Sequence, residues 1–167
     1  MQRIMFATKK SQNHLVGELL YRNAEYSIDF LPTSKSEIAS ASGQLGRSSL
    51  TMGTLQLEVS IETGRVLYPW GLFPLMHCKQ TKLTMRPLLN GEIYVDITQL
   101  MLASGVAYAI PGADQWELLR DLDTGWICVG NADMSENVVL IEFSTDAVMS
   151  FKEEKFIALW LHPSMET

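Results

Sequence analysis

A strict alternation of apolar and polar residues over residues 54–62 constrains the fold more than any other feature of this sequence. A period of two places alternate side chains on opposite sides of an extended chain. The segment therefore predicts a β-strand with one buried face and one solvated face. The residues expected to face the core are Leu55, Leu57, Val59 and Ile61.

Turn residues next to apolar stretches predict that strands are joined mainly by hairpins. Gly64 in a left-handed conformation would close the turn after the alternating strand, and the return strand would cover residues 66–70. Asn90-Gly91 is the strongest two-residue turn signal in the chain. The predicted hairpins have their turns at residues 62–65, at 90–91 between strands 82–89 and 92–98, and at 152–155 between strands 147–151 and 156–161.

Helix is predicted to be scarce. Asp114 and Glu117 have the spacing of a capping pair, and Trp116 and Leu119 would follow on one side of a helix. Two short apolar stretches, at residues 15–22 and 98–104, fit a short helix or a strand. The predicted fold class is α+β or mostly β, with an antiparallel hairpin-rich sheet and one to three short helices.

Length and composition predict a single domain over residues 1–167. The chain is 47% hydrophobic and 19% charged, which is ordinary for a globular protein with its own core. Residues 32–49 hold six serines with little periodicity. We expect this Ser-rich segment to be a long surface loop, although a lid or a binding loop is the functional alternative.

The charge is unevenly distributed along the chain. From Glu92 to Asp146 there are ten acidic residues and one basic residue, Arg120, whereas residues 1–91 hold ten basic and six acidic residues. A pI near 5.0 disfavours nucleic acid as the main partner. No apolar stretch has the roughly 18 residues of a membrane span, and two cysteines make no disulfide framework, so we expect a cytoplasmic protein.

One tripeptide resembles a catalytic motif. Asp123-Thr124-Gly125 is similar to the tripeptide at the catalytic centre of retroviral-type aspartic proteases, which implies a paired carboxylate and dimerisation. The sequence departs from that family at Trp126, where a small residue is expected, and no matching downstream strand motif follows. We therefore interpret Asp123 as a turn residue.

Other site chemistry has little support in the sequence. The three histidines are far apart, no zinc or calcium spacing is present, and the glycine-containing segments lack the lysine of a phosphate loop. We expect no cofactor and no metal.

The acidic middle of the chain carries the functional hypothesis. We expect a non-enzymatic protein-binding module that contacts a basic partner, for example an inhibitor or immunity-type protein that neutralises a basic nuclease or toxin. The alternative is a small hydrolase or ligand-binding domain whose site assembles only in three dimensions. The expected partner-binding residues are Asp114, Glu117, Asp121, Asp123, Asp133 and Glu136.

Overall fold

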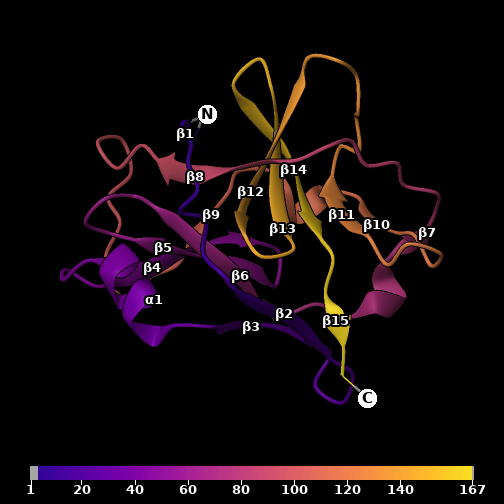
Figure 1. Cartoon of the computed structure of the whole chain (residues 1–167), viewed down its shortest axis with the longest axis horizontal. Helices are drawn as coiled ribbons and strands as arrows, with labels where there is room; N and C mark the ends of the chain where they lie inside the picture. Colours follow the sequence, from indigo (N-terminus) through magenta and orange to yellow (C-terminus); the bar gives the residue numbers. More distant parts are fainter. Residues whose placement is uncertain (1–3, 167) are drawn as a thin grey trace.

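The computed structural model describes residues 4–166, which form two β-sheets, one α-helix and two 3-10 turns (Figure 1). The first sheet has the strand order β1 (Phe6–Lys10), β8 (Leu89–Val95), β12 (Val138–Ser144), β13 (Ala147–Lys152), β14 (Lys155–Leu161), β11 (Ile127–Gly130), β10 (Leu118–Arg120) and β7 (Lys79–Gln80). The second sheet has the order β15 (Ser164–Met165), β2 (Gly17–Arg22), β3 (Ser27–Pro32), β6 (Val66–Leu72), β5 (Leu55–Ser60), β4 (Arg47–Met52) and β9 (Tyr108–Ala109). The helical elements are α1 (Lys35–Ser42), η1 (Leu75–His77) and η2 (Ala113–Gln115).

This architecture confirms a mostly β fold with one short helix and short 3-10 turns. Antiparallel hairpins dominate, but both sheets are mixed. Parallel pairs join β8 to β12 and β7 to β10 in the first sheet, and β15 to β2 and β4 to β9 in the second.

The alternating strand is β5, and its apolar side faces the main core. Leu55, Leu57 and Val59 are buried in a cluster that also contains Ile141 and Leu159 of the first sheet. The two sheets therefore pack their apolar faces against each other, and this shared core supplies most of the buried hydrophobic area.

The turns after β5 and β10 have the same construction. After β5, the Ser60 hydroxyl accepts the backbone N–H groups of residues 62 and 63, and Gly64 N–H donates to the Ser60 carbonyl oxygen at 2.9 Å. After β10, an Asp121 carboxylate oxygen accepts the backbone N–H groups of residues 123 and 124. Gly125 N–H donates to the Asp121 carbonyl oxygen, as Gly64 does to that of Ser60. The φ angles of the two glycines are 82° and 83°, a region that disfavours residues with a Cβ. The predicted turn at residues 62–65 is confirmed.

The first sheet is apolar on both faces, which the alternation along its central hairpin explains. On β13 and β14, Met149 and Leu159 point into the main core, whereas Val148 and Trp160 point to the opposite face. Trp160 is fully buried there. The outer face of this sheet therefore needs a cover of its own.

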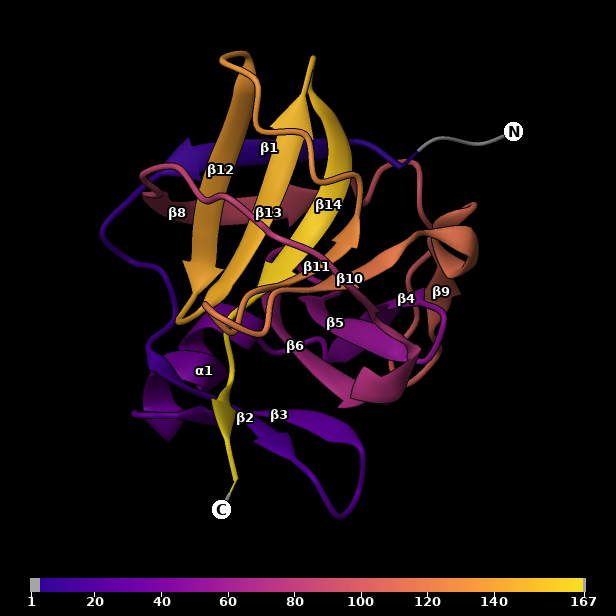
Figure 2. The ribbon, with the colours of Figure 1, turned by 90° about the vertical axis from the view of Figure 1, so that its right-hand side faces the viewer.

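An extended segment without regular structure, residues 81–88, provides that cover, and we name it the strap. It crosses the outer face of β12, β13 and β14 in Figure 2. Leu83 is buried against this face, and Met85 and Leu88 pack on it. At one end the backbone N–H of Leu83 donates to Asp121 at 2.9 Å, and at the other Arg86 donates to the carbonyl oxygen of Val138.

The hairpin predicted at Asn90-Gly91 is wrong. Residues 82–88 belong to the strap, and β8 runs straight through the dipeptide. Gly91 has no positive φ; instead, a Cβ at this position would lie 2.6 Å from the carbonyl oxygen of Lys9. The glycine thus serves the close approach of β1 to β8 rather than a turn. Beyond it, β1 and β8 run across the direction of β12, β13 and β14 (Figure 2).

The third predicted hairpin is confirmed. β13 and β14 pair antiparallel, and Glu153 and Glu154 form a two-residue turn with φ angles of 51° and 65°. Two consecutive positive φ angles are the signature of the turn that suits the twist of a hairpin.

The helix predictions need two corrections. The Ser-rich segment is not all loop, because α1 occupies its middle: the Ser34 hydroxyl caps the helix by accepting the N–H of Glu37, and Ile38 packs on the core. The helix predicted from Asp114 is only the 3-10 turn η2, because the chain then becomes strand β10, whose backbone pairs with β11. Of the two ambiguous apolar stretches, 15–22 contains β2, whereas 98–104 has neither helix nor strand.

Among residues 4–166, no helix has the length and apolar character needed to cross a membrane.

We predict that Leu57→Ala lowers the free energy of unfolding by about 2 to 5 kcal/mol, because it leaves a cavity in the shared core. The same truncation at the exposed Leu45 serves as the control and should change that free energy by less than about 0.5 kcal/mol. Chemical denaturation of both variants measures the difference. If Leu57→Ala lowered the free energy of unfolding no more than Leu45→Ala does, β5 would not face the core.

Candidate functional site

The six acidic residues expected to bind a partner do not form one group in the structure. Asp114 and Glu117 lie just before β10, Asp121 and Asp123 lie in the turn after it, and Asp133 and Glu136 lie in the loop before β12. Two of the six have structural roles, whereas the other four have exposed side chains.

Asp121 is the buried one, with 4% of its surface exposed. It accepts hydrogen bonds from the backbone N–H groups of Leu83, Asp123 and Thr124. These bonds, that from Leu83 first among them, hold the pKa of Asp121 below its ordinary value. Asp121 therefore joins the strap to the turn after β10, and its carboxylate has no surface left for a partner.

Asp133 forms an ion pair with Lys152, with 2.6 Å between the carboxylate oxygen and Nζ. The hydrogen bond from Lys152, together with one from the Ser135 backbone, lowers the pKa of Asp133 to about 2. This pair links the loop before β12 to the end of β13, and it neutralises one charge of the acidic segment.

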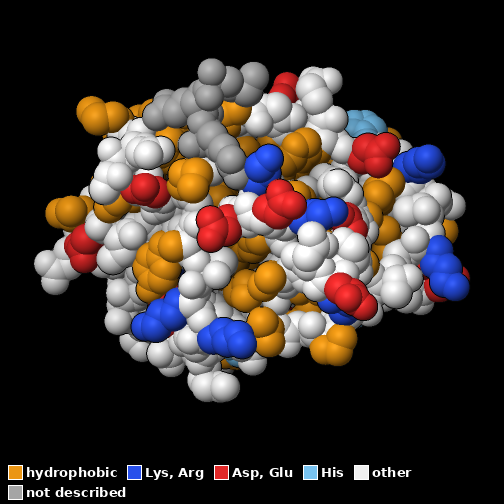
Figure 3. Space-filling model, turned by 90° about the horizontal axis from the view of Figure 1, so that it is seen from above, with side chains coloured by type: hydrophobic (Ala, Val, Ile, Leu, Met, Phe, Trp, Pro, Cys, Tyr) orange, Lys and Arg blue, Asp and Glu red, His pale blue; other side chains and the backbone are white. Residues whose placement is uncertain are grey.

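The face of the molecule toward which the loop of the β13–β14 hairpin projects is not uniformly acidic. Acidic and basic side chains are interspersed there, with hydrophobic side chains between them (Figure 3). The unequal charge along the sequence therefore does not translate into a continuous acidic surface on this face.

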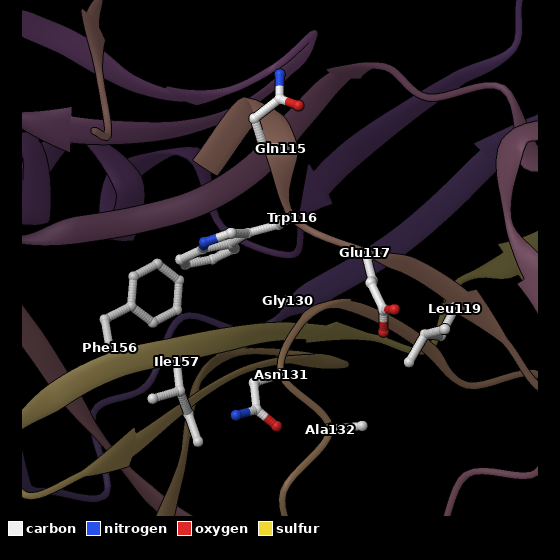
Figure 4. A pocket seen from close by; sticks show the side chains of 9 residues that line it. All are labelled: Gln115, Trp116, Glu117, Leu119, Gly130, Asn131, Ala132, Phe156 and Ile157. Atoms are coloured by element: carbon white, nitrogen blue, oxygen red, sulfur yellow. The ribbon is translucent and has the colours of Figure 1, made fainter. Parts of the chain in front are cut away.

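A pocket of about 640 Å³ lies beside the start of β10. We name it the Trp116 pocket. Figure 4 shows its side chains: Trp116 and Phe156 form an aromatic wall, the Glu117 carboxylate points toward the bend at Gly130, and the Gln115 amide points away. The lining residues are Gln115, Trp116, Glu117, Leu119, Gly130, Asn131, Ala132, Phe156 and Ile157.

The local sequence explains why the aromatic wall forms. Trp116 is extended, with ψ of 146°, because it follows the last residue of η2. Its ring lies edge-on to Phe156 with centroids 5.2 Å apart, and Phe156 in turn packs edge-on to Phe6 of β1. Aromatic pairs in this geometry are favourable. Phe6 of the edge strand β1 thus packs on Phe156 and supports the aromatic wall.

Gly130 determines how close the indole can approach the end of β11. Its φ is 121°, and a Cβ there would lie 2.4 Å from the carbonyl oxygen of Ile157 and 3.0 Å from the six-membered ring of Trp116. Only glycine leaves this space open. The Gly130 N–H donates to the Glu117 carbonyl oxygen at 2.9 Å, which places the Glu117 side chain at the pocket.

Of the residues in the described range 4–166, Glu117 is the only charged one that lines the Trp116 pocket. Its carboxylate forms no ion pair within residues 4–166, and it is exposed. Burial, and then the nearby Glu117 charge, raise the pKa of the Cys128 thiol to about 12. The pocket therefore combines an aromatic wall with one negative charge that has no counter-ion in the described chain.

Sequence reasoning identified Glu117 but missed the residues around it. The helix predicted from Asp114 would contain Trp116, and Phe156 is predicted only as the start of a strand. Gly130 followed by Asn131 at the end of an apolar stretch was the available signal, because such a pair marks the place where a strand ends.

The other chemical candidates do not gather into a site. Within the described residues, no group of three or more His, Cys, Asp or Glu side chains is placed to hold a metal ion. Burial raises the pKa of Cys78 to about 11, so its thiol is not poised as a nucleophile. Asp123-Thr124-Gly125 lies in the exposed turn after β10, where His162 contacts the Thr124 carbonyl oxygen at 2.8 Å and stacks on Trp126.

No protein-family model matches the sequence, and comparison with curated proteins finds no significant match. The functional argument therefore rests on the site itself.

Asp121 and Asp123 are two residues apart but should respond differently to the same substitution. We predict that Asp121→Asn lowers the melting temperature, because an amide replaces an acceptor of three backbone N–H groups. Asp123→Asn, in the same turn but exposed, should leave the melting temperature unchanged. Thermal unfolding at pH 7 measures both.

The pH dependence provides a second readout. Because the pKa of Asp121 is lowered on folding, its stabilisation is present above about pH 4, the ordinary pKa of aspartate, and is lost as the pH falls through the lowered value. The gap in melting temperature between wild type and Asp121→Asn should narrow between pH 7 and pH 3. A difference in melting temperature that does not change with pH, or no difference at any pH, would contradict the role assigned to Asp121.

Proposed function

We propose that this protein is a non-enzymatic binding module that recognises a basic protein partner through the Trp116 pocket and the acidic side chains beside it. The observation that carries the proposal is the unpaired Glu117 carboxylate beside the aromatic wall. Protein-binding sites are typically centred on buried or half-buried aromatic residues, with charge that complements the partner.

The structure narrows the set of acidic residues available for binding. Asp121 and Asp133 are engaged internally, so the partner-facing charge comes from Asp114, Glu117, Asp123 and Glu136, all of which are exposed. Asp114 lies closest to the pocket in sequence, three residues before Glu117. Together these two carboxylates give the segment before β10 a local negative charge.

A field of this kind acts mainly on the rate of encounter. Complementary charge steers a basic partner toward the site and raises the association rate, and salt screens the effect. An inhibitor or immunity-type protein that captures a basic nuclease or toxin fits this behaviour, and such a role agrees with the cytoplasmic location expected from the sequence. Nucleic acid is a poor partner for the same site, because its phosphates would meet an unpaired carboxylate.

A ligand-binding domain is the second candidate, and the size of the pocket favours it. About 640 Å³ lies within the range of small-molecule sites, which is roughly 300 to 1,000 Å³. The charge argument is the same in either case, because a small ligand for this pocket would also be cationic.

We predict that the double reversal Asp114→Lys with Glu117→Lys slows association with the natural partner by about tenfold or more at low salt, and much less at about 1 M salt. The matched control reverses Glu18 and Glu25, two exposed acids near the opposite sheet, and gives the same change in net charge. Because the local field is what matters, the control should associate at close to the wild-type rate.

The partner is first isolated by affinity capture from the cell of origin, then purified for stopped-flow kinetics at both salt concentrations. Support requires a basic partner that is captured by wild type and by the control but poorly by the double reversal. A partner whose association is slowed equally by both double variants would reduce the effect to net charge. A partner whose association rate is changed by neither double variant would refute the proposal.

A further inference from the structure

We infer that the Trp116 pocket receives an arginine side chain, whose planar guanidinium lies against the aromatic wall and pairs with the Glu117 carboxylate. This inference rests on the proposed function, because it names the group of the basic partner that enters the pocket. Four features of the site support it: its charge, its engaged backbone donors, its aromatic wall and the direction of the Glu117 side chain.

The charge of the lining selects a cation. Among the described residues, Glu117 contributes the only charged group, and no Lys, Arg or His side chain lines the pocket. A ligand carboxylate or phosphate would therefore meet repulsion without any compensating charge. A cationic group would instead gain a partner for a carboxylate that has none within the described residues.

The backbone at the pocket offers little to an anion. Anion sites in proteins commonly use free backbone N–H groups. Here the N–H of Gly130 donates to the Glu117 carbonyl oxygen, and the N–H of Asn131 donates to the Ile157 carbonyl oxygen, each at 2.9 Å. Both donors at the bend are thus already used, which leaves the carboxylate as the dominant polar group.

The aromatic wall favours guanidinium over ammonium. Arginine stacks its flat, weakly hydrated head on aromatic rings and presents paired N–H groups that match a carboxylate, whereas the ammonium group of lysine is compact and strongly hydrated. Trp116 and Phe156 provide the rings, and tryptophan is the best aromatic partner for a cation. The indole N–H of Trp116 has no acceptor among the described residues, so no hydrogen bond ties that edge of the ring to the protein.

The direction of Glu117 places its carboxylate where a stacked guanidinium ends. In Figure 4 the carboxylate and the side chain of Asn131 border the same space in front of Gly130, with the indole along one side. Asn131 is itself held in place, because its side-chain oxygen accepts the Asp133 N–H at 3.0 Å.

Three peptides that differ at one residue test the inference: acetyl-Gly-Xaa-Gly-amide with arginine, lysine or citrulline, the uncharged isostere of arginine. Titration at low salt, followed by tryptophan fluorescence and calorimetry, measures each affinity. We expect the arginine peptide to bind about tenfold or more tightly than the citrulline peptide and about threefold or more tightly than the lysine peptide.

Variants of the pocket assign the preference to its two parts. Glu117→Gln should reduce the preference for arginine over citrulline to less than about twofold, and Trp116→Leu should remove the preference for arginine over lysine. Glu25→Gln changes an exposed acid that neither lines the pocket nor belongs to the partner-facing set, and it should leave all three affinities unchanged. Melting curves of the variants exclude a loss that comes from unfolding.

The outcomes separate this inference from the proposed function. Equal affinity for arginine and lysine, or no peptide binding while the purified partner still depends on Asp114 and Glu117, would overturn the arginine inference and leave the binding function standing. Equal affinity for arginine and citrulline would overturn the role of charge in the pocket. Loss of both peptide binding and partner dependence would overturn the two together.

Discussion

The β13–β14 hairpin must be buried on both of its faces, and the rest of the fold follows from this requirement. Its inward side chains join the core shared with the second sheet, and its outward side chains, Trp160 above all, need a separate cover. The strap meets that need without forming a strand. Because an irregular segment satisfies few of its own backbone groups, it depends on side-chain anchors such as Asp121.

This requirement also explains why the acidic segment has two kinds of acid. Strand β10 lies between β11 and the edge strand β7 of the first sheet, and the turn after it holds the strap, so Asp121 is committed to structure. The residues just before β10 do not hold the strap. Two of them, Trp116 and Glu117, lie on either side of the space in front of Gly130. A run of like charges in the sequence thus divides into an internal anchor, Asp121, and an exposed carboxylate, Glu117, at the Trp116 pocket.

Local patterns in the sequence predicted two of the three hairpins, but they gave no sign of the strap or of the Trp116 pocket. The period of two in β5 and the turn at Gly64 depend on neighbouring residues, so they were readable. The signal for α1 was also local, since Ser34 and Glu37 have capping-box spacing, but the density of serines obscured it. By contrast, Gly91 and the Trp116 pocket depend on chain segments that approach from far away, and no local pattern reports them.

The central claim is that a cation enters one particular site, and the indole N–H signals of the four tryptophans test it most directly. Trp70 donates to Glu58, Trp160 is buried beneath the strap, and Trp126 stacks on His162, so only Trp116 lines the proposed site. In a ¹H–¹⁵N spectrum titrated with N-acetylarginine amide, the account predicts that the Trp116 signal shifts with saturation while the other three stay in place. A titration that moves the Trp126 signal instead, or that moves none of the four, would contradict it.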